Sequence, residues 1–378
     1  MPYWRVSSFY FFYFGVLGVL VPYWGLYLQS LGFSPERIGG LLALMMASRV
    51  IAPNVWGWVA DHYRGGLAVV RWTSLLAAIA FVGTFFNTDF GWLALVMVTF
   101  SFFWHAALPV LDAVAMNYLG HRPGAYGQVR FWGSVGFIVT VVVFGMVVEA
   151  YGPWWILPTL LALFVSIWLC SLTLPATRTA EHEESATSFL KFALRPDVVA
   201  FLLAGFFMQV SHGPYYTFYS IYLDALGYSK TTIGLLWAFG VLCEIGIFIW
   251  MPFLLSRFSL HQVLLSSFLA ATVRWLLIGF CAERFDVLIA AQALHAATFG
   301  AFHAAGIQIV YRFFTGRHQH RGQALYGTAS FGLGGVVGHF YSGYSWGALG
   351  PAATFAIAAV AAGIASLVAL FWIKPTKD

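Results

Sequence analysis

The sequence predicts an all-α membrane protein of twelve transmembrane helices, arranged as two six-helix parallel repeats. The 378 residues are 61% hydrophobic and only 9% charged, against roughly 25% charged in soluble domains. The apolar residues also fall into runs of about 20, the length that crosses a bilayer as a helix. We count twelve runs, approximately 8–30, 37–59, 68–88, 91–117, 127–148, 153–174, 198–224, 231–254, 261–281, 285–311, 323–346 and 350–373.

The basic residues predict the orientation of these spans. With the N-terminus inside, thirteen Lys and Arg residues fall in cytoplasmic segments, and only Arg37, Lys230 and Arg284 fall outside. The positive-inside rule then puts both termini in the cytoplasm. The net charge of +5 is spread over loops, so it does not indicate nucleic-acid binding. The first apolar run is too long for a cleaved signal peptide, and we expect a multi-pass protein of the cell inner membrane.

A polar stretch at 177–197 divides the chain into two halves. We expect an N-terminal six-helix bundle over 1–176, a cytoplasmic linker over 177–197 and a C-terminal six-helix bundle over 198–378. Residues 23–49 align without gaps to 218–244 at an offset of 195, and Gly32 recurs as Gly227. His105 recurs as His303 at an offset of 198. Six spans per half predict parallel repeats, related by an axis along the membrane normal.

Five charged residues lie inside the apolar runs, where each costs about 2.5–3.5 kcal/mol even on the lenient insertion scale. They are therefore expected to face a wet cavity or one another. They are Arg49, Asp112, Arg130, Glu244 and Arg274.

Asp112 and Arg130 stand near the cytoplasmic ends of spans 4 and 5, and we expect an ion pair that opens when substrate takes one partner. The alternative is a topological anchor. Arg49 and Glu244 occupy equivalent places in spans 2 and 8, with opposite charge. The guanidinium of Arg49 suits bidentate capture of a carboxylate, although a structural ion pair is also open. Arg274 serves either proton coupling or the cohesion of the second half.

Histidines and aromatic residues add to this set. His295 and His303 are eight residues apart, about two turns, and should lie close to one face. Each could exchange protons near neutral pH, and the alternative is a hydrogen-bonded packing role. The pair Gly213-Pro214 after His212 indicates a helix break. Tyr23 and Trp24 are candidates for lining the cavity, whereas interfacial anchoring explains most other aromatic residues.

The sequence holds no pattern for a metal, a nucleophile or a cofactor. There is no His-Glu-x-x-His, no clustered Cys and His, and no phosphate-binding glycine loop with a lysine. We therefore expect no cofactor and no metal, and the three cysteines indicate no disulfide framework.

The segment GWVADHYRGG, Gly57–Gly66, resembles the signature between spans 2 and 3 of the major facilitator superfamily. Gly57, Asp61 and Arg64 match it, and the resemblance implies that they form a gating loop. The displaced glycine and His62 make the match partial.

Within that superfamily, nearly the whole chain resembles the lactose permease and phenylpropionate permease group. Residues 108–136 are similar to the sugar permease segment with an acid and an arginine eighteen residues apart, here Asp112 and Arg130. Arg274 and His295 resemble the arginine and histidine of its proton-coupling region, and Glu244 resembles its span-8 acid. Residues 45–61 and 294–305 look more like the phenylpropionate branch. The sugar permeases carry a glutamate three residues after the histidine, where this chain has Thr298, so the resemblance leaves the proton carrier unassigned.

Three buried arginines against two acids favour an anionic ligand. The sequence therefore predicts a proton-coupled symporter, not an enzyme, that imports a small organic solute by alternating access. With the aromatic residues, the resemblance to the phenylpropionate branch implies that the solute is an aromatic carboxylate such as phenylpropionate. The expected partners are this substrate, a proton and the lipid bilayer around a monomer. The residues assigned to the substrate are Tyr23, Trp24, Arg49, His105, Asp112, Arg130, Glu244 and His303, and those assigned to the proton are Asp112, Glu244, Arg274, His295 and His303.

Two alternatives remain open at this point. The first is a proton-coupled sugar or nucleoside permease, in which the arginines donate hydrogen bonds to hydroxyl groups. The second is an intramembrane enzyme that uses the Asp and His residues as acid and base.

Overall fold

The computed structural model describes residues 2–63, 65–119, 125–175, 189–315 and 318–373. Within these ranges every regular element is a helix, and no strand occurs. The chain divides into two compact units, Met1–Glu183 with Tyr228–Leu235, and Glu184–Gly227 with Leu236–Asp378. The all-α fold class is confirmed for the described residues.

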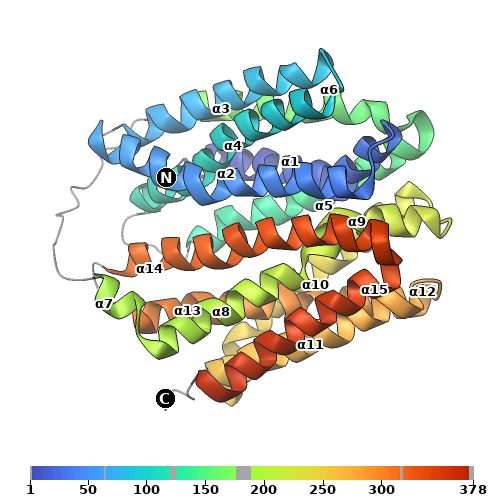
Figure 1. The fold of residues 1–378 in the computed structure, drawn as a ribbon. Helices are drawn as coiled ribbons and strands as arrows, with labels where there is room; N and C mark the ends of the chain where they lie inside the picture. Colours follow the sequence, from blue (N-terminus) through green and yellow to red (C-terminus); the bar gives the residue numbers. More distant parts are fainter. Residues whose placement is uncertain (1, 64, 120–124, 176–188, 316–317, 374–378) are drawn as a thin grey trace. The chain divides into compact units, whose positions relative to one another are not determined.

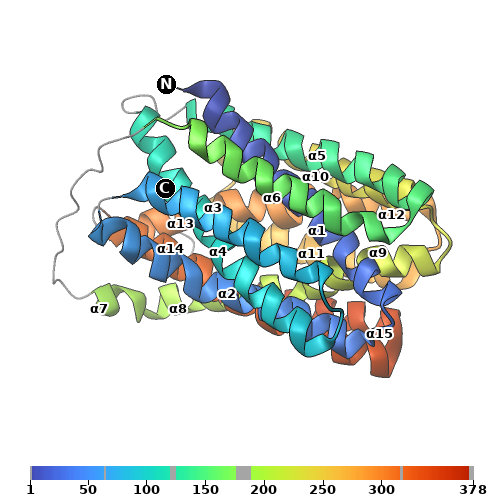
Figure 2. The ribbon, with the colours of Figure 1, turned by 90° about the horizontal axis from the view of Figure 1, so that it is seen from above.

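The first unit consists of long apolar helices that pack along one another (Figures 1 and 2). Helix α1 packs against α5 and α6, α2 packs against α4, and α3 packs against both α4 and α6. The elements are α1 (Tyr3–Ser30), α2 (Pro35–His62), α3 (Gly66–Val82), η1 (Gly83–Phe85), α4 (Phe90–Leu119), α5 (Ala125–Tyr151), η2 (Pro153–Trp155) and α6 (Ile156–Thr173).

In the second unit, α15 packs against α8, α9 and α11, and α11 also packs against α12, η3 and α13. The start of α10 groups with the first unit. The elements are α7 (Phe189–Ala193), α8 (Pro196–Ser211), α9 (Gly213–Ala225), α10 (Lys230–Arg257), α11 (Leu260–Cys281), α12 (Phe285–Ala293), η3 (Ala296–Ala301), α13 (Phe302–Phe313), α14 (Gln319–Tyr326), η5 (Gly327–Gly334) and α15 (Gly335–Trp372).

Eleven described helical segments are long and apolar enough to cross a membrane. The last of them, Arg321–Trp372, has 52 residues, which is about 78 Å at 1.5 Å per residue and far exceeds a hydrocarbon core of about 30 Å. It turns at Gly350, whose φ of 81° and ψ of 178° are not helical. This turn divides the segment into two spans, as the sequence predicts for 323–346 and 350–373.

The internal repeat also appears in the backbone. The described residues contain four glycines with positive φ, Gly32, Gly152, Gly227 and Gly350. Gly32 and Gly227 are 195 residues apart, and Gly152 and Gly350 are 198 apart, the two offsets seen in the sequence. Because side chains other than glycine rarely adopt this conformation, both halves place the same turns at the same points of the repeat.

The break predicted at Gly213-Pro214 is present, since α8 ends at Ser211 and α9 begins at Gly213. A Cβ atom on Gly213 would lie 2.3 Å from the carbonyl oxygen of Gly338 in α15. Glycine is therefore required here by the close approach of two backbones.

Two predicted loops are partly helical. Gly57 and Asp61 lie in the last turns of α2, which continues to His62 because this stretch holds no residue that breaks a helix. Gly57 and Asp61 therefore lie on a helix and not in a loop, their part in gating stays a prediction, and Arg64 lies outside the described residues. The predicted linker over 177–197 contains α7 and the start of α8, and its residues 177–188 lie outside the described ranges.

Candidate functional site

In the first unit, two tyrosines surround the carboxylate of Asp112 on α4. The hydroxyl of Tyr10, on α1, donates to Oδ1 of Asp112 at 2.5 Å, and that of Tyr126, on α5, donates to the same oxygen at 3.0 Å. Hydrogen bonds to a charged acceptor are stronger than neutral ones, so these phenols stabilise an ionised carboxylate among apolar helices. Oδ1 accepts both bonds, and Oδ2 accepts none from the described residues.

Arg130 on α5 does not form the predicted contact ion pair with Asp112. No salt bridge joins these two described side chains, because the phenols occupy Oδ1 and the guanidinium lies on an aromatic ring instead. Its central carbon is 3.8 Å from the centroid of Phe14 and 5.6 Å from that of Tyr10. Arg130 and Asp112 interact electrostatically over a longer distance. Among the described residues, Arg130 finds no hydrogen-bond acceptor.

A glycine makes the space in which Arg130 lies. A Cβ atom on Gly133 would be 2.7 Å from Nη1 of Arg130 and 2.8 Å from a ring carbon of Phe14. Such distances are too short for carbon, so any larger residue would push the guanidinium away from the ring. Gly133 therefore helps to position Arg130.

The N-terminal unit has a second polar cluster between α2 and α4. The hydroxyl of Ser48 lies 2.9 Å from Oγ of Ser101 and 2.8 Å from Nδ1 of His105, and all three side chains are buried. The ring of His105 stacks on Trp104 at 5.0 Å. Ser48 also donates to the carbonyl of Met45, so its single hydrogen is shared and the tautomer of His105 is not fixed.

Tyr13 connects the two clusters of this unit. It is buried, its hydroxyl lies 3.4 Å from the carbonyl of Trp104, and it interacts electrostatically with Arg49, Asp112 and Arg130. Arg49 also interacts with His105. Tyr13 thus lies within electrostatic reach of two arginines and one acid.

In the second unit, Arg274 on α11 is fully buried and extensively bonded. Its Nη1 donates to Nδ1 of His295 at 3.1 Å and to the hydroxyl of Thr298 at 3.0 Å. Its Nη2 donates to Oε1 of Gln292 at 2.9 Å. The guanidinium also lies over the rings of Tyr215 and Trp275 at 4.2 and 4.7 Å. These contacts compensate for the loss of water around a charge that is 0% exposed.

Glu244 on α10 lies on the other side of His295. Its Oε2 is 3.5 Å from Nε2 of the imidazole, and the two side chains are 14% and 7% exposed. The segment η3, which begins directly after His295, is π-helical, a form found often at functional sites. A Cβ atom on Gly300 in η3 would be 3.1 Å from Cγ of Glu244, so this glycine lets the acid approach the histidine closely.

The prediction that His295 and His303 share one face is confirmed. Phe299 stacks between them, 5.4 Å from His295 and 6.1 Å from His303, with nearly parallel rings. His212 has a structural environment: Nδ1 lies 2.8 Å from the carbonyl of Met208, and Trp275 packs edge-on against its ring. Since a carbonyl only accepts, His212 carries its hydrogen on Nδ1.

Tyr23 and Trp24, predicted to contact the substrate, are wholly buried in the first unit. The hydroxyl of Tyr23 donates to the carbonyl of Val141 at 2.8 Å, and Trp24 packs against Tyr27 and Phe81. These contacts are those of core residues, so we leave both out of the candidate site.

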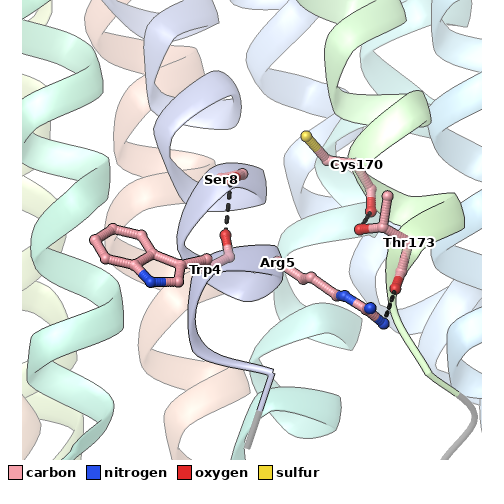
Figure 3. Close-up of a pocket in the computed structure, with 5 residues that line it drawn as sticks. All are labelled: Trp4, Arg5, Ser8, Cys170 and Thr173. Carbon is pink, nitrogen blue, oxygen red and sulfur yellow. Dashed lines mark hydrogen bonds between the residues drawn. The ribbon is translucent and has the colours of Figure 1, made fainter.

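A surface pocket lies away from these clusters, between the start of α1 and the end of α6 (Figure 3). Arg5 is its charged residue, and Nη1 of Arg5 donates to the carbonyl of Thr173 at 3.0 Å. Arg71 likewise donates to the carbonyls of Ser171 and Leu174. The last carbonyls of a helix lack partners and carry partial negative charge, so both arginines cap α6, which explains their place without a ligand.

The sequence analysis missed several residues of these clusters. Tyr10, Phe14 and Tyr126 are three aromatics among many, and nothing in their spacing indicates Asp112 and Arg130. Gln292 is the exception, because a fully buried amide three residues before His295 on an apolar helix is a polar signal of its own. Among the described residues, no group of three or more His, Cys, Asp or Glu could hold a metal ion.

Comparison with known proteins identifies the architecture. A family model described as "MFS_1 like family" matches residues 3–357. The chain belongs to this family. It is a multi-pass membrane transporter of the major facilitator type and not an enzyme, so the predicted family and fold are confirmed and the intramembrane-enzyme alternative is wrong.

Two relatives and one solved structure are similar to this MFS_1-like transporter over most of its length. "Probable 3-phenylpropionic acid transporter" of Escherichia coli (strain K12) is 32% identical over 363 residues, 93% of each chain. "Maltose permease" of Geobacillus stearothermophilus is 25% identical over 350 residues, 89% of this chain and 86% of that protein. The crystal structure of the nucleoside transporter NupG superposes with a TM-score of 0.86 at 17% identity, covering 99% of this chain and 100% of the other, which shows the shared fold alone.

Proposed function

We propose that this transporter imports a small aromatic carboxylate, such as 3-phenylpropionate, together with protons, by alternating access across the cell inner membrane. Both termini lie in the cytoplasm in this proposal, and the unit of transport is a monomer of two bundles, 1–176 and 198–378, joined by the segment 177–197. Gly57, Asp61 and Arg64 contribute to gating.

Arg130 is the observation that carries the proposal. Its guanidinium lies over the ring of Phe14, 3.8 Å from the centroid, and the described residues offer it no acceptor. A carboxylate would supply two acceptor oxygens in the plane of the guanidinium fork. The ring of an aromatic acid would then lie close to Phe14, Tyr10 and Tyr13, aromatic groups that already surround the arginine.

Charge supports an anion in the same place. The guanidinium groups of Arg49 and Arg130 both interact electrostatically with Tyr13, which packs against Phe14. Two positive charges around this ring attract a carboxylate ligand. The relative named for 3-phenylpropionic acid, at 32% identity, fits this chemistry.

A neutral sugar or nucleoside is the second candidate. It is favoured by the maltose permease relative and by Oδ2 of Asp112, which accepts no hydrogen bond from the described residues and could accept one from a hydroxyl group.

Uptake of labelled 3-phenylpropionate, with its amide as competitor, separates the two candidates. We expect the acid to compete and the amide to fail, because the amide cannot form the charge-assisted pair with Arg130. The variant Arg130→Lys should weaken binding about tenfold to a hundredfold, because charge-assisted hydrogen bonds are worth about 1.5–3 kcal/mol and an ammonium lacks the fork.

Arg284→Lys is the matched control, since Arg284 is an exposed arginine paired with Asp286 at 2.7 Å. Equal competition by acid and amide, or unchanged affinity in Arg130→Lys, would contradict carboxylate capture. Competition by maltose or nucleosides instead would favour the second candidate.

A further inference from the structure

The hydrogen bonds of Arg274 determine where the proton of His295 sits. A guanidinium has only donors, so the 3.1 Å contact between Nη1 of Arg274 and Nδ1 of His295 requires an unprotonated Nδ1. A neutral imidazole with a bare Nδ1 carries its hydrogen on Nε2. Nε2 is the atom that faces Oε2 of Glu244 at 3.5 Å. The imidazole is thus a neutral bridge that accepts from the arginine and donates towards the acid.

A second proton on His295 would disrupt this arrangement. It would place an N–H on Nδ1 against an N–H of Arg274, two donors and two positive charges in a fully buried position. Arg274 cannot turn away without losing its bonds to Thr298 and Gln292 and its contacts with Tyr215 and Trp275. Gln292 is in turn fixed, because its amide donates to the hydroxyl of Tyr215 and to the carbonyl of Leu236.

A proton on Glu244 creates no such clash with His295. A protonated carboxyl group keeps one acceptor oxygen, so Glu244 can remain beside Nε2–H of His295, at the contact distance of 3.5 Å, after it binds a proton. Its side chain is 14% exposed, whereas Arg274, Gln292 and Thr298 are 0% exposed. The other titratable or charged described groups around the pair include Arg274, Tyr215, His212 and His303.

We propose that Glu244 takes up and releases the transported proton, and that Arg274, held by Thr298 and Gln292, keeps His295 as the neutral Nε2–H tautomer. In each cycle the carboxylate of Glu244 gains one proton and later returns it, while His295 stays neutral. The role of Glu244 rests on the proposed proton coupling, whereas the tautomer of His295 does not. This proposal assigns the proton carrier. The resemblance to the sugar permeases left it unassigned, because this chain has Thr298 where they have a glutamate.

Nitrogen-15 NMR of histidine-labelled protein in nanodiscs tests the tautomer without any substrate. Resonances of His295 are assigned from their loss in His295→Gln, with His295→Asn as a second variant if the first does not fold. We expect a bare Nδ1 and a protonated Nε2 from about pH 8 to about pH 5, a range in which added free histidine titrates. An imidazolium signal from His295 within that range would overturn the proposal.

Thr298 provides a matched pair for the same measurement. Thr298→Val has the same shape but removes the hydroxyl that accepts from Arg274, so part of His295 should become doubly protonated at the acidic end. Thr298→Ser keeps a hydroxyl and should resemble the unmodified protein. Identical spectra for the Val and Ser variants would remove Thr298 from the group that positions Arg274.

Proteoliposomes with an imposed pH gradient test the carrier, with 3-phenylpropionate as probe. Glu244→Gln should lose accumulation, reaching equal concentrations on both sides, but should retain exchange, which moves no net proton. His295→Gln should still accumulate, because its amide offers an N–H to Glu244 and cannot titrate.

Full accumulation by Glu244→Gln, or loss of accumulation with intact exchange in His295→Gln, would overturn the assignment. If the unmodified protein exchanges the probe but ignores the gradient, proton coupling fails and the role of Glu244 fails with it. The NMR result then still decides the tautomer. The two failures are therefore distinguishable.

Discussion

The two units treat an arginine among apolar helices in opposite ways. Arg274 in the second unit is 0% exposed and donates three hydrogen bonds to side chains of its own unit. Arg130 in the first unit lies on Phe14, and the described residues give it no acceptor. An arginine that donates to acceptors within its own unit stabilises the fold. One that lies over an aromatic ring keeps its donors available for a ligand. This difference separates a structural arginine from a binding arginine, although both look alike in the sequence.

The largest expected effect contrasts the two arginines directly. Arg274→Gln should lower the free energy of unfolding by about 3–5 kcal/mol, because it breaks a buried charged network and leaves its partners without donors. Arg130→Gln should change it by less than about 1 kcal/mol while abolishing high-affinity binding. Thermal unfolding of the purified variants in detergent measures both. Similar losses of stability would refute the contrast.

A smaller effect is expected from the glycine beside Arg130. Gly133→Ala should weaken binding of the aromatic acid about tenfold, a loss of about 1.4 kcal/mol, because the new methyl group displaces the guanidinium from Phe14. Gly127→Ala is the matched control, on the same helix α5 with nothing within 4 Å of the added carbon. Alanine favours the helix at both sites by roughly 0.5–1 kcal/mol, so stability should not fall in the control. Equal affinities for the two variants would show that the position of Arg130 on Phe14 does not matter for binding.

The smallest effect concerns the phenols around Asp112. Tyr126→Phe should cost about 1 kcal/mol of stability, because Oδ1 of Asp112 loses one of two hydrogen bonds among described residues. The loss should be present while Asp112 is ionised and should shrink as the pH falls and the carboxylate is protonated, since the phenol stabilises the charged form. Thermal unfolding at several pH values measures this, with Tyr151→Phe as control, because Tyr151 is a tyrosine of the same helix α5 that is 69% exposed. A loss that does not depend on pH would argue that Tyr126 acts through packing alone.

Much of the fold was predictable from local pattern. Runs of apolar residues give the spans, and Gly32 and Gly350, which adopt positive φ, mark turns that recur in both halves. The break at Gly213-Pro214 follows from the same reasoning. The end of α2 was not predicted correctly, because a charged motif was interpreted as a loop although nothing in it stops a helix.

The candidate site was predictable only in part. Charged residues in apolar runs drew attention to Asp112, Arg130, Glu244 and Arg274, because their cost in a membrane does not depend on what they contact. The predicted ion pair between Asp112 and Arg130 was wrong. Spacing along the chain does not reveal that the hydroxyl of Tyr10, 102 residues away from Asp112, donates to this carboxylate.

The sequence by itself determined that this chain crosses a membrane many times, that its two halves are related, and where charge is buried, since each depends on composition and local order. Only the tertiary structure decided which arginine donates to side-chain acceptors of its own unit and which nitrogen of His295 carries the hydrogen. Those answers depend on contacts between separate helices. Arg274 lies on α11, for example, and Thr298 lies on η3, 24 residues later. Hydrogen-bond direction is a property of the assembled neighbours, and no single helix encodes it.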